Sequence, residues 1–119
     1  MRQAFAHQAV LIMAPDADVQ APGAAITTEL CGRYDHEPPC PLAPHHTRAE
    51  RADGEVHLRI LFATEPNSED VVRQRIGLAL GRGNLSGPDG TTTRWQLRDA
   101  RRSEVSTEET DHATRLTRS

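Results

Sequence analysis

The sequence predicts an α+β fold: a small, mainly antiparallel sheet of about four strands with one helix packed on one face. Three observations support this prediction. Several short segments are dense in apolar and β-branched residues, one segment between 66 and 81 repeats its apolar residues at helical spacing, and Gly, Pro and Asp separate these segments. The expected order is strand, strand, Cys/His loop, strand, helix, strand. With 119 residues, we expect one domain over 1–99, followed by a polar, disordered tail over 100–119.

The first two expected strands lie near the start of the chain. Residues 8–14 (QAVLIMA) are apolar at consecutive positions, which is typical of a strand covered on both faces. Residues 24–31 (AAITTELC) are rich in β-branched side chains, so we expect a strand with Ile26 and Leu30 on one face and Cys31 on the other. A helix is the competing interpretation of 24–31, because Ala, Glu and Leu all favour helices.

The clearest strand and the one expected helix follow each other. Residues 47–55 (TRAERADGE) form a polar connector with a turn at Asp53-Gly54. Residues 55–64 (EVHLRILFAT) alternate apolar and polar side chains, which predicts a half-buried strand. The segment 66–81 opens with Pro-Asn-Ser, which offers a helix cap, and continues with an apolar stripe at helical spacing. The residues of that stripe are Val72, Ile76, Ala79 and Leu80.

The end of the chain holds one more expected strand and then loses its apolar residues. Residues 91–99 (TTTRWQLRD) predict a strand with Trp95 directed inward. From residue 100 onward, Val105 and Leu116 are the only large apolar residues. Such a segment buries too little apolar surface to offset the entropy of ordering, so we expect the tail to be disordered.

Composition and charge exclude some classes of protein. The net charge of −3 argues against a general nucleic-acid binder, which would carry a basic face. No run approaches the ~18 apolar residues of a membrane helix, so we expect no membrane partner and a cytoplasmic location. All 14 basic side chains are arginine, which indicates the codon bias of a GC-rich genome, and we expect a bacterial source.

One stretch, CGRYDHEPPCPLAPHH (31–46), concentrates the residues that bind metals. Both cysteines and three of the six histidines lie in it, with the spacing Cys31-x4-His36-x3-Cys40-x4-His45 and with His46 directly after. Zinc prefers four tetrahedral ligands, and two thiolates with two imidazoles provide them without excess charge. The sequence therefore predicts a structural zinc site from Cys31, His36, Cys40 and one of His45 and His46.

The prolines of the same stretch strengthen the prediction of a metal loop. Each proline fixes its own φ and restricts the residue before it, so the stretch can neither continue a helix nor join a central strand. A segment restricted in this way loses less entropy when it is ordered around an ion. The four prolines are Pro38, Pro39, Pro41 and Pro44.

Several alternatives remain open for these residues. Cys31 and Cys40 could form a disulfide with incidental histidines, although that requires an oxidising compartment. A catalytic or transport site would use three protein ligands and an open position. In a hydrolase, Glu37 could act as general base for zinc-bound water, although a solvated loop side chain is the simpler interpretation. A loop without metal is the last alternative.

We expect a small zinc-stabilised binding or regulatory domain without catalytic activity. The metal would stabilise a thin core, because only 36% of the residues are hydrophobic. The partner would be an unknown protein or a second copy of the chain, bound on the sheet face that the helix leaves uncovered. Exposed apolar residues on that face motivate this expectation: Leu61, together with Met13 or Leu11. A zinc-dependent hydrolase and a metal carrier or sensor are the alternatives.

Overall fold

The computed structural model describes residues 1–31, 43–87 and 89–118. In this part of the chain, a four-stranded antiparallel sheet combines with three α-helices, which confirms the predicted α+β class. The strands are β1 (Gln3–Ile12), β2 (His45–Ala52), β3 (Glu55–Thr64), β4 (Asn84–Ser86), β5 (Thr92–Arg94) and β6 (Gln96–Ser103). The α-helices are α1 (Ala21–Cys31), α2 (Glu69–Gly81) and α3 (Thr110–Thr117), and single 3-10 turns, η1 (Pro66–Ser68) and η2 (Thr107–Glu109), precede α2 and α3.

The main sheet has the strand order β2-β3-β1-β6, with β1 and β3 in the centre. Each neighbouring pair is antiparallel. The short hairpin of β4 and β5 forms a separate sheet between α2 and β6. Without that hairpin, the chain runs β-α-β-β-α-β, which is the split βαβ or ferredoxin-like arrangement, and α3 is added at its end.

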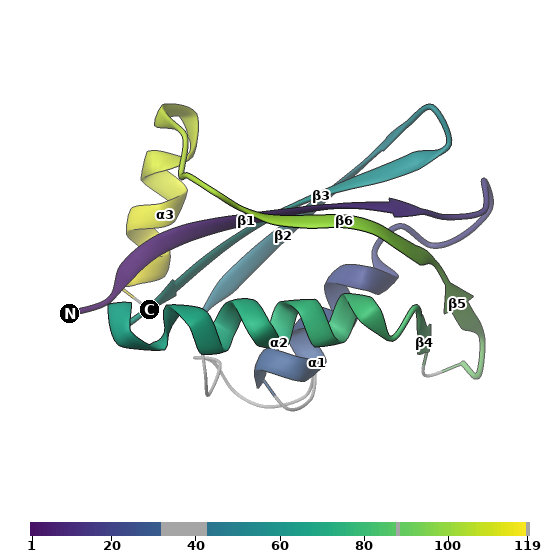
Figure 1. Cartoon of the computed structure of the whole chain (residues 1–119), viewed down its shortest axis with the longest axis horizontal. Helices are drawn as coiled ribbons and strands as arrows, with labels where there is room; N and C mark the ends of the chain where they lie inside the picture. Colours follow the sequence, from purple (N-terminus) through teal and green to yellow (C-terminus); the bar gives the residue numbers. More distant parts are fainter. Residues whose placement is uncertain (32–42, 88, 119) are drawn as a thin grey trace.

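The core lies between the sheet and two helices. Figure 1 shows α1 and α2 together on one side of the sheet and α3 on the other. The larger hydrophobic cluster joins α1 and α2 to β1 and β3, and includes the fully buried Leu11, Ile26, Ile60, Phe62, Ile76 and Leu80. Burying a side chain of this size contributes about 1.5–3 kcal/mol. A smaller cluster under α3 contains Ala6, Leu61, Ala63 and Leu116.

The prediction of a strand at 24–31 was wrong, because these residues form α1. Ile26 and Leu30 are four residues apart and both buried, and Ala25 is buried beside them, so a helical face satisfies the apolar pattern. The hydroxyl of Thr28 donates to the carbonyl of Ala24 at 3.1 Å, which is a helical i−4 contact. The helix thus completes a βαβ unit that the strand interpretation excluded.

The prediction of a polar connector at 47–55 was also wrong in part, because most of these residues belong to β2. This strand lies at the edge of the sheet, and its alternate residues Thr47 and Ala49 are partly buried while Arg48 and Glu50 are exposed. An edge strand with one solvated face needs few large apolar residues. The predicted turn is present: Asp53 and Gly54 have φ of 52° and 81°, as a two-residue type I′ hairpin requires.

The prediction of a disordered C-terminal tail was wrong for residues 100–118, most of which lie in β6, η2 and α3. β6 continues to Ser103 and pairs with β1 as far as Ala6. α3 then packs Ala113 and Leu116 against the sheet face opposite α1 and α2. A reciprocal capping box between Ser106 and Glu109 caps η2, the turn before α3. The one-helix prediction therefore missed both α1 and α3.

The strand at 55–64 and the helix that follows it agree with the predictions. β3 spans Glu55–Thr64, and α2 begins after η1 and ends at Gly81. The four buried residues of α2 are those of the predicted stripe: Val72, Ile76, Ala79 and Leu80. Trp95 is buried as expected and donates its indole N–H to the carbonyl of Leu80 at 2.9 Å, but it lies between β5 and β6 rather than within one strand.

Candidate functional site

Three of the predicted metal ligands lie at the end of α1 or the start of β2. Cys31 is the last residue of α1, and His45 and His46 are the first two residues of β2. His36 and Cys40 lie outside the described residues. Within the ranges that the structure describes, no group of three or more His, Cys, Asp or Glu side chains could hold a metal ion. The zinc site consequently stays a prediction, and His45 and His46 are the two candidate ligands with described side chains.

His45 faces α1 and contacts it directly. Its Nε2 lies 3.0 Å from the hydroxyl oxygen of Thr27, and its Nδ1 lies 3.1 Å from the carbonyl oxygen of Ala43. A carbonyl can only accept, so Nδ1 carries the proton, and Nε2 of the neutral ring has its lone pair toward α1. Burial lowers the pKa of His45 below its usual value, which favours this neutral form, although the Ala43 contact opposes the shift.

Gly23 permits the close approach of α1 to β2 beside His45. A Cβ atom at Gly23 would lie 3.3 Å from two side-chain carbons of Thr47, so even an alanine would require Thr47 to shift by a few tenths of an ångström. A groove of about 370 Å³ lies here, lined by Gly23, Thr27, His45 and Thr47 among others. The helix and the strand are therefore in direct contact in the first turn of α1, about two turns before Cys31, where the predicted metal loop begins.

His46 lies on the opposite face of the sheet, as expected for the next residue of a strand. Its ring centroid is 4.5 Å from that of His112 in α3. The pKa of His46 is lowered by partial burial first, and then by the neighbouring His112 and Arg48. The two adjacent histidines thus point to different sides of the molecule, and the structure brings His46 together with α3 rather than with α1.

The uncovered sheet face is not the apolar surface that the sequence predicted. Leu61 is only 3% exposed because α3 covers it, and Leu11 and Met13 are buried on the face of α1 and α2. The rest of the face holds a polar groove of about 370 Å³ across all four strands. Its lining includes His57 and the charged side chains of Arg48, Glu50, Arg59, Asp99 and Arg101.

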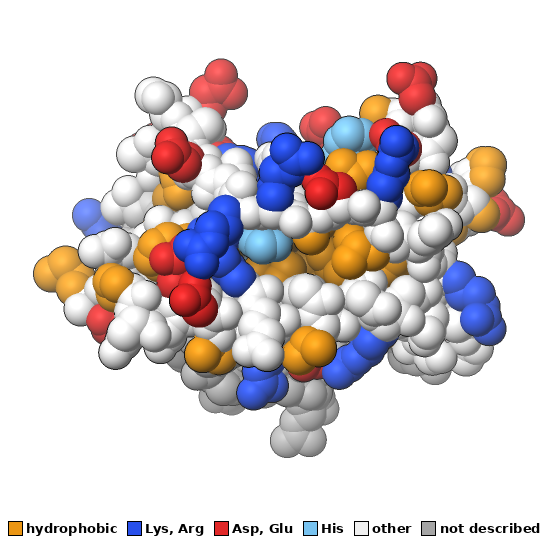
Figure 2. Space-filling model, viewed as in Figure 1, with side chains coloured by type: hydrophobic (Ala, Val, Ile, Leu, Met, Phe, Trp, Pro, Cys, Tyr) orange, Lys and Arg blue, Asp and Glu red, His pale blue; other side chains and the backbone are white. Residues whose placement is uncertain are grey.

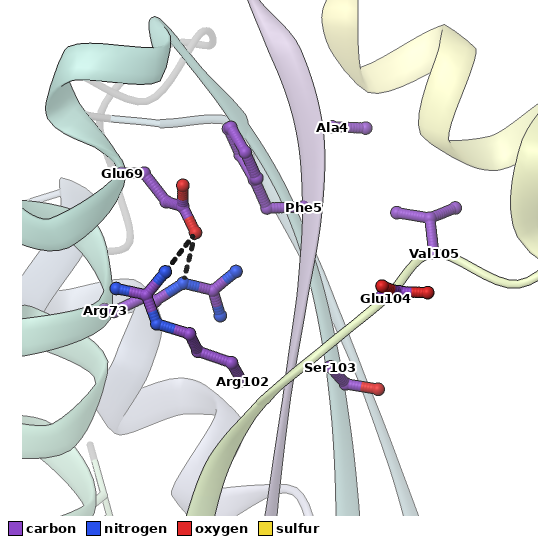
Figure 3. Close-up of a pocket in the computed structure, with 8 residues that line it drawn as sticks. All are labelled: Ala4, Phe5, Glu69, Arg73, Arg102, Ser103, Glu104 and Val105. Atoms are coloured by element: carbon purple, nitrogen blue, oxygen red, sulfur yellow. Dashed lines mark hydrogen bonds and ion pairs between the residues drawn. The ribbon is translucent and has the colours of Figure 1, made fainter.

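A second charged cluster lies between α2 and the sheet. Figure 2 shows arginine and carboxylate side chains gathered over the N-terminal part of α2. In Figure 3, Glu69 stands between two guanidinium groups: it accepts from Arg73 Nε at 2.7 Å and from Arg102 Nη1 at 3.1 Å. Phe5 lines the same cavity of about 500 Å³, and Arg73 lies 5.9 Å from the centre of its ring. Arg102 also pairs with Asp70 at 2.6 Å, so two carboxylates balance the two arginines and the cluster carries no net positive charge for an anionic ligand.

His7 is the buried end of this cluster. Arg73 Nη1 lies 2.7 Å from the carbonyl oxygen of Ala6 and 3.0 Å from Nδ1 of His7, so the imidazole accepts a hydrogen bond in its neutral form. Burial, followed by the charges of Arg73 and Arg102, lowers the pKa of His7 to about 4. His7 therefore joins β1 to α2 only while it is unprotonated.

We expect acid to destabilise the protein through His7. The pKa of His7 is about 4 in the folded protein and 6.5 in an unfolded chain, so the unfolded chain binds this proton first. The stabilisation is complete above pH 6.5, and about 2–3 kcal/mol of it is lost as the pH falls toward 4. Urea unfolding of wild-type and His7→Asn chains between pH 7 and 4 measures this loss, since Asn keeps an acceptor but does not titrate. Equal pH dependence in the two chains would refute the assignment.

Most of the side-chain contacts that join the elements could not be predicted from the sequence. The Glu69–Arg73 pair has the i,i+4 spacing of a helical ion pair and could be predicted. The contacts of Arg73 with Ala6 and His7 join residues that are 66 or more positions apart, so no local sequence pattern predicts them. The same holds for Arg59, which binds Glu109 from 50 residues away.

The comparisons with known proteins add no assignment. No family model matches the chain, and neither a curated protein nor a solved structure matches it. In the described ranges, no helix has both the length and the apolar character needed to cross a membrane.

Proposed function

We propose that the protein is a small, non-catalytic binding or regulatory domain, and that Cys31, His36, Cys40 and His45 hold a structural zinc ion. The observation that carries the proposal is the state of His45. With Nδ1–H donated to the Ala43 carbonyl, Nε2 is left as the basic nitrogen, and ligating histidines commonly use this arrangement. The hydroxyl of Thr27 can donate to the Gly23 carbonyl, 3.2 Å away, when Nε2 binds a metal instead.

The two described ends of the ligand sequence also support a closed site. α1 ends at Cys31 and β2 begins at His45, and Thr27, one helical turn before Cys31, contacts His45. An ion held by both ends would therefore fix α1 against the edge of the sheet. Zinc held by four protein ligands contributes its binding free energy to folding.

The strongly shifted pKa values support a structural role for the charged side chains. Those of His7 and Glu109 are shifted most, to about 4 and about 2. Burial lowers the pKa of His7 most and hydrogen bonds from Arg59 lower that of Glu109 most, so both shifts have a structural cause. Structural ion pairs shift pKa values as active sites do. We accordingly assign binding, rather than proton transfer, to this domain.

A matched pair of variants tests the proposal. We expect His45→Ala to lose the metal, because His45 faces α1, and His46→Ala to keep about one zinc ion per chain, because His46 faces α3. Elemental analysis of untagged protein purified without chelator gives the metal content, and circular dichroism checks that each variant is folded. Metal loss in His46→Ala alone, or equal metal in both variants, would contradict the assignment.

A further inference from the structure

We infer that β2 is the interface of a homodimer, in which the free edge of β2 pairs antiparallel with β2 of a second copy, centred on Ala49. The inference does not depend on the zinc site. In the described part of the chain, β2 is hydrogen-bonded to β3 on one side only, and it terminates the sheet. A sheet edge presents backbone N–H and C=O groups to any strand that can align with it.

The length and the edge position of β2 favour pairing with another strand. β2 has eight residues, which is longer than the typical strand of about five or six. Figure 1 shows the turn of its hairpin with β3 at the upper right, away from α2 and α3. Native proteins commonly shorten or cover such edges, and in the described residues no further strand is hydrogen-bonded to β2.

Charge decides the register. A two-fold axis perpendicular to the sheet keeps each face on its own side, so Arg48 and Glu50, which share the solvated face, must oppose residues of that face. With the axis at Ala49, Arg48 of each copy lies opposite Glu50 of the other. An axis at Arg48 or at Glu50 would place identical charges opposite each other, which destabilises a strand pair. Only the Ala49 register sets both opposite-charge pairs directly across the interface.

The side chains concerned are available for this pairing. Those of Arg48 and Glu50 are 65% and 69% exposed, and within one strand their nearest charged atoms are 3.8 Å apart, so the existing pair is weak. Ala49 has only a methyl group at the axis, which leaves room for strands at the usual spacing of about 4.8 Å. The product is one continuous sheet of eight strands, four from each copy.

Charge reversal with rescue tests the inference. We expect wild-type protein to be a dimer by sedimentation equilibrium at low salt, and Arg48→Glu or Glu50→Arg to weaken the dimer at least about tenfold. The double swap Arg48→Glu with Glu50→Arg restores both pairs and should restore the dimer. Arg101→Glu, on the same face but in β6, is the matched control and should leave the dimer intact.

A cross-link tests the register itself. Opposed residues of antiparallel strands have Cα atoms about 4.5–5.5 Å apart, which is within disulfide reach. Ala49→Cys should therefore form a covalent dimer through position 49 on oxidation, and Ala52→Cys should not. A wild-type chain that stays monomeric at millimolar concentration would overturn the inference and show that the edge charges prevent association. A double swap that fails to restore the dimer would overturn it as well.

Discussion

Replacing Arg59 with methionine is expected to lower the free energy of unfolding by about 2–3 kcal/mol and to release α3 from the sheet. Arg59 lies in β3, and its guanidinium donates to both carboxylate oxygens of Glu109, at 2.8 and 3.1 Å. It also bonds the hydroxyl of Ser103 and the carbonyl of Glu104. The side chains of Arg59 and Glu109 are only 19% and 16% exposed, so methionine would leave a mostly buried carboxylate without its cation.

The acid sensitivity of the same contact gives a second way to observe it. Hydrogen bonds from Arg59, opposed by burial and aided by Ser106, lower the pKa of Glu109 from 4.5 to about 2. Because the folded pKa is the lower one, the stabilisation is present above pH 4.5 and is lost as the pH falls toward 2. In Arg59→Met this acid-dependent loss should shrink.

Urea unfolding followed by circular dichroism measures both effects. Arg101→Met is the matched control, because Arg101 pairs with Asp99 on the surface and such pairs contribute less than about 1 kcal/mol. Hydrogen exchange should show faster exchange of the amides of α3 in Arg59→Met alone. If Arg59→Met and Arg101→Met are equally stable, Arg59 does not hold α3.

The second large effect is expected at the predicted metal ligands. Cys31→Ser and Cys40→Ser each remove a thiolate, and serine is a poor zinc ligand. In the proposed structural site, the metal joins the end of α1 to the start of β2, so its loss removes binding free energy from folding. We expect each variant to lose its zinc and at least about 3 kcal/mol of stability, or roughly 12 °C in Tm.

The loss of stability distinguishes a structural site from the alternatives. A carrier or an open catalytic site would lose its metal in the same variants with little change in Tm. Differential scanning calorimetry of wild-type, Cys31→Ser and Cys40→Ser chains, all reduced, gives the comparison. A free-thiol count on protein prepared without reductant tests the disulfide alternative, in which both thiols would be absent.

Long periodic segments could be predicted from the sequence, whereas short ones could not. The alternation in 55–64 and the helical stripe in 66–81 each leave one interpretation. The eight residues at 24–31 fit both periods, because Ile26 and Leu30 share a face in a strand and also in a helix. Packing against α2 decides the outcome, and that contact is remote in sequence.

The edge strand and the last helix were missed for a related reason. β2 is covered on one face only, so it contains few large apolar residues and resembles a loop. α3 buries only Ala113 and Leu116, and the Arg59–Glu109 ion pair joins the turn before it to β3. The number of apolar residues in a segment does not reveal a charged side chain on a distant strand that contacts it.

For the candidate site, the sequence predicted residue types but not their directions. It offered one of His45 and His46 as a ligand, and as adjacent residues of a strand the two lie on opposite faces of the sheet. It could not indicate that His45 faces α1 or that His46 meets His112, because both neighbours come from elements that the sequence assigned wrongly. It also placed the interaction surface on apolar residues that α1, α2 and α3 cover.

In the proposed site, a zinc ion stabilises the domain through the Cys31–His45 segment. Elemental analysis of untagged, reduced protein, combined with thermal unfolding before and after treatment with a strong chelator, tests this role of the metal. We expect about one zinc ion per chain and a Tm that falls by at least about 12 °C on chelation and recovers when zinc is restored. Protein that is folded and free of metal, with an unchanged Tm after chelation, would contradict it.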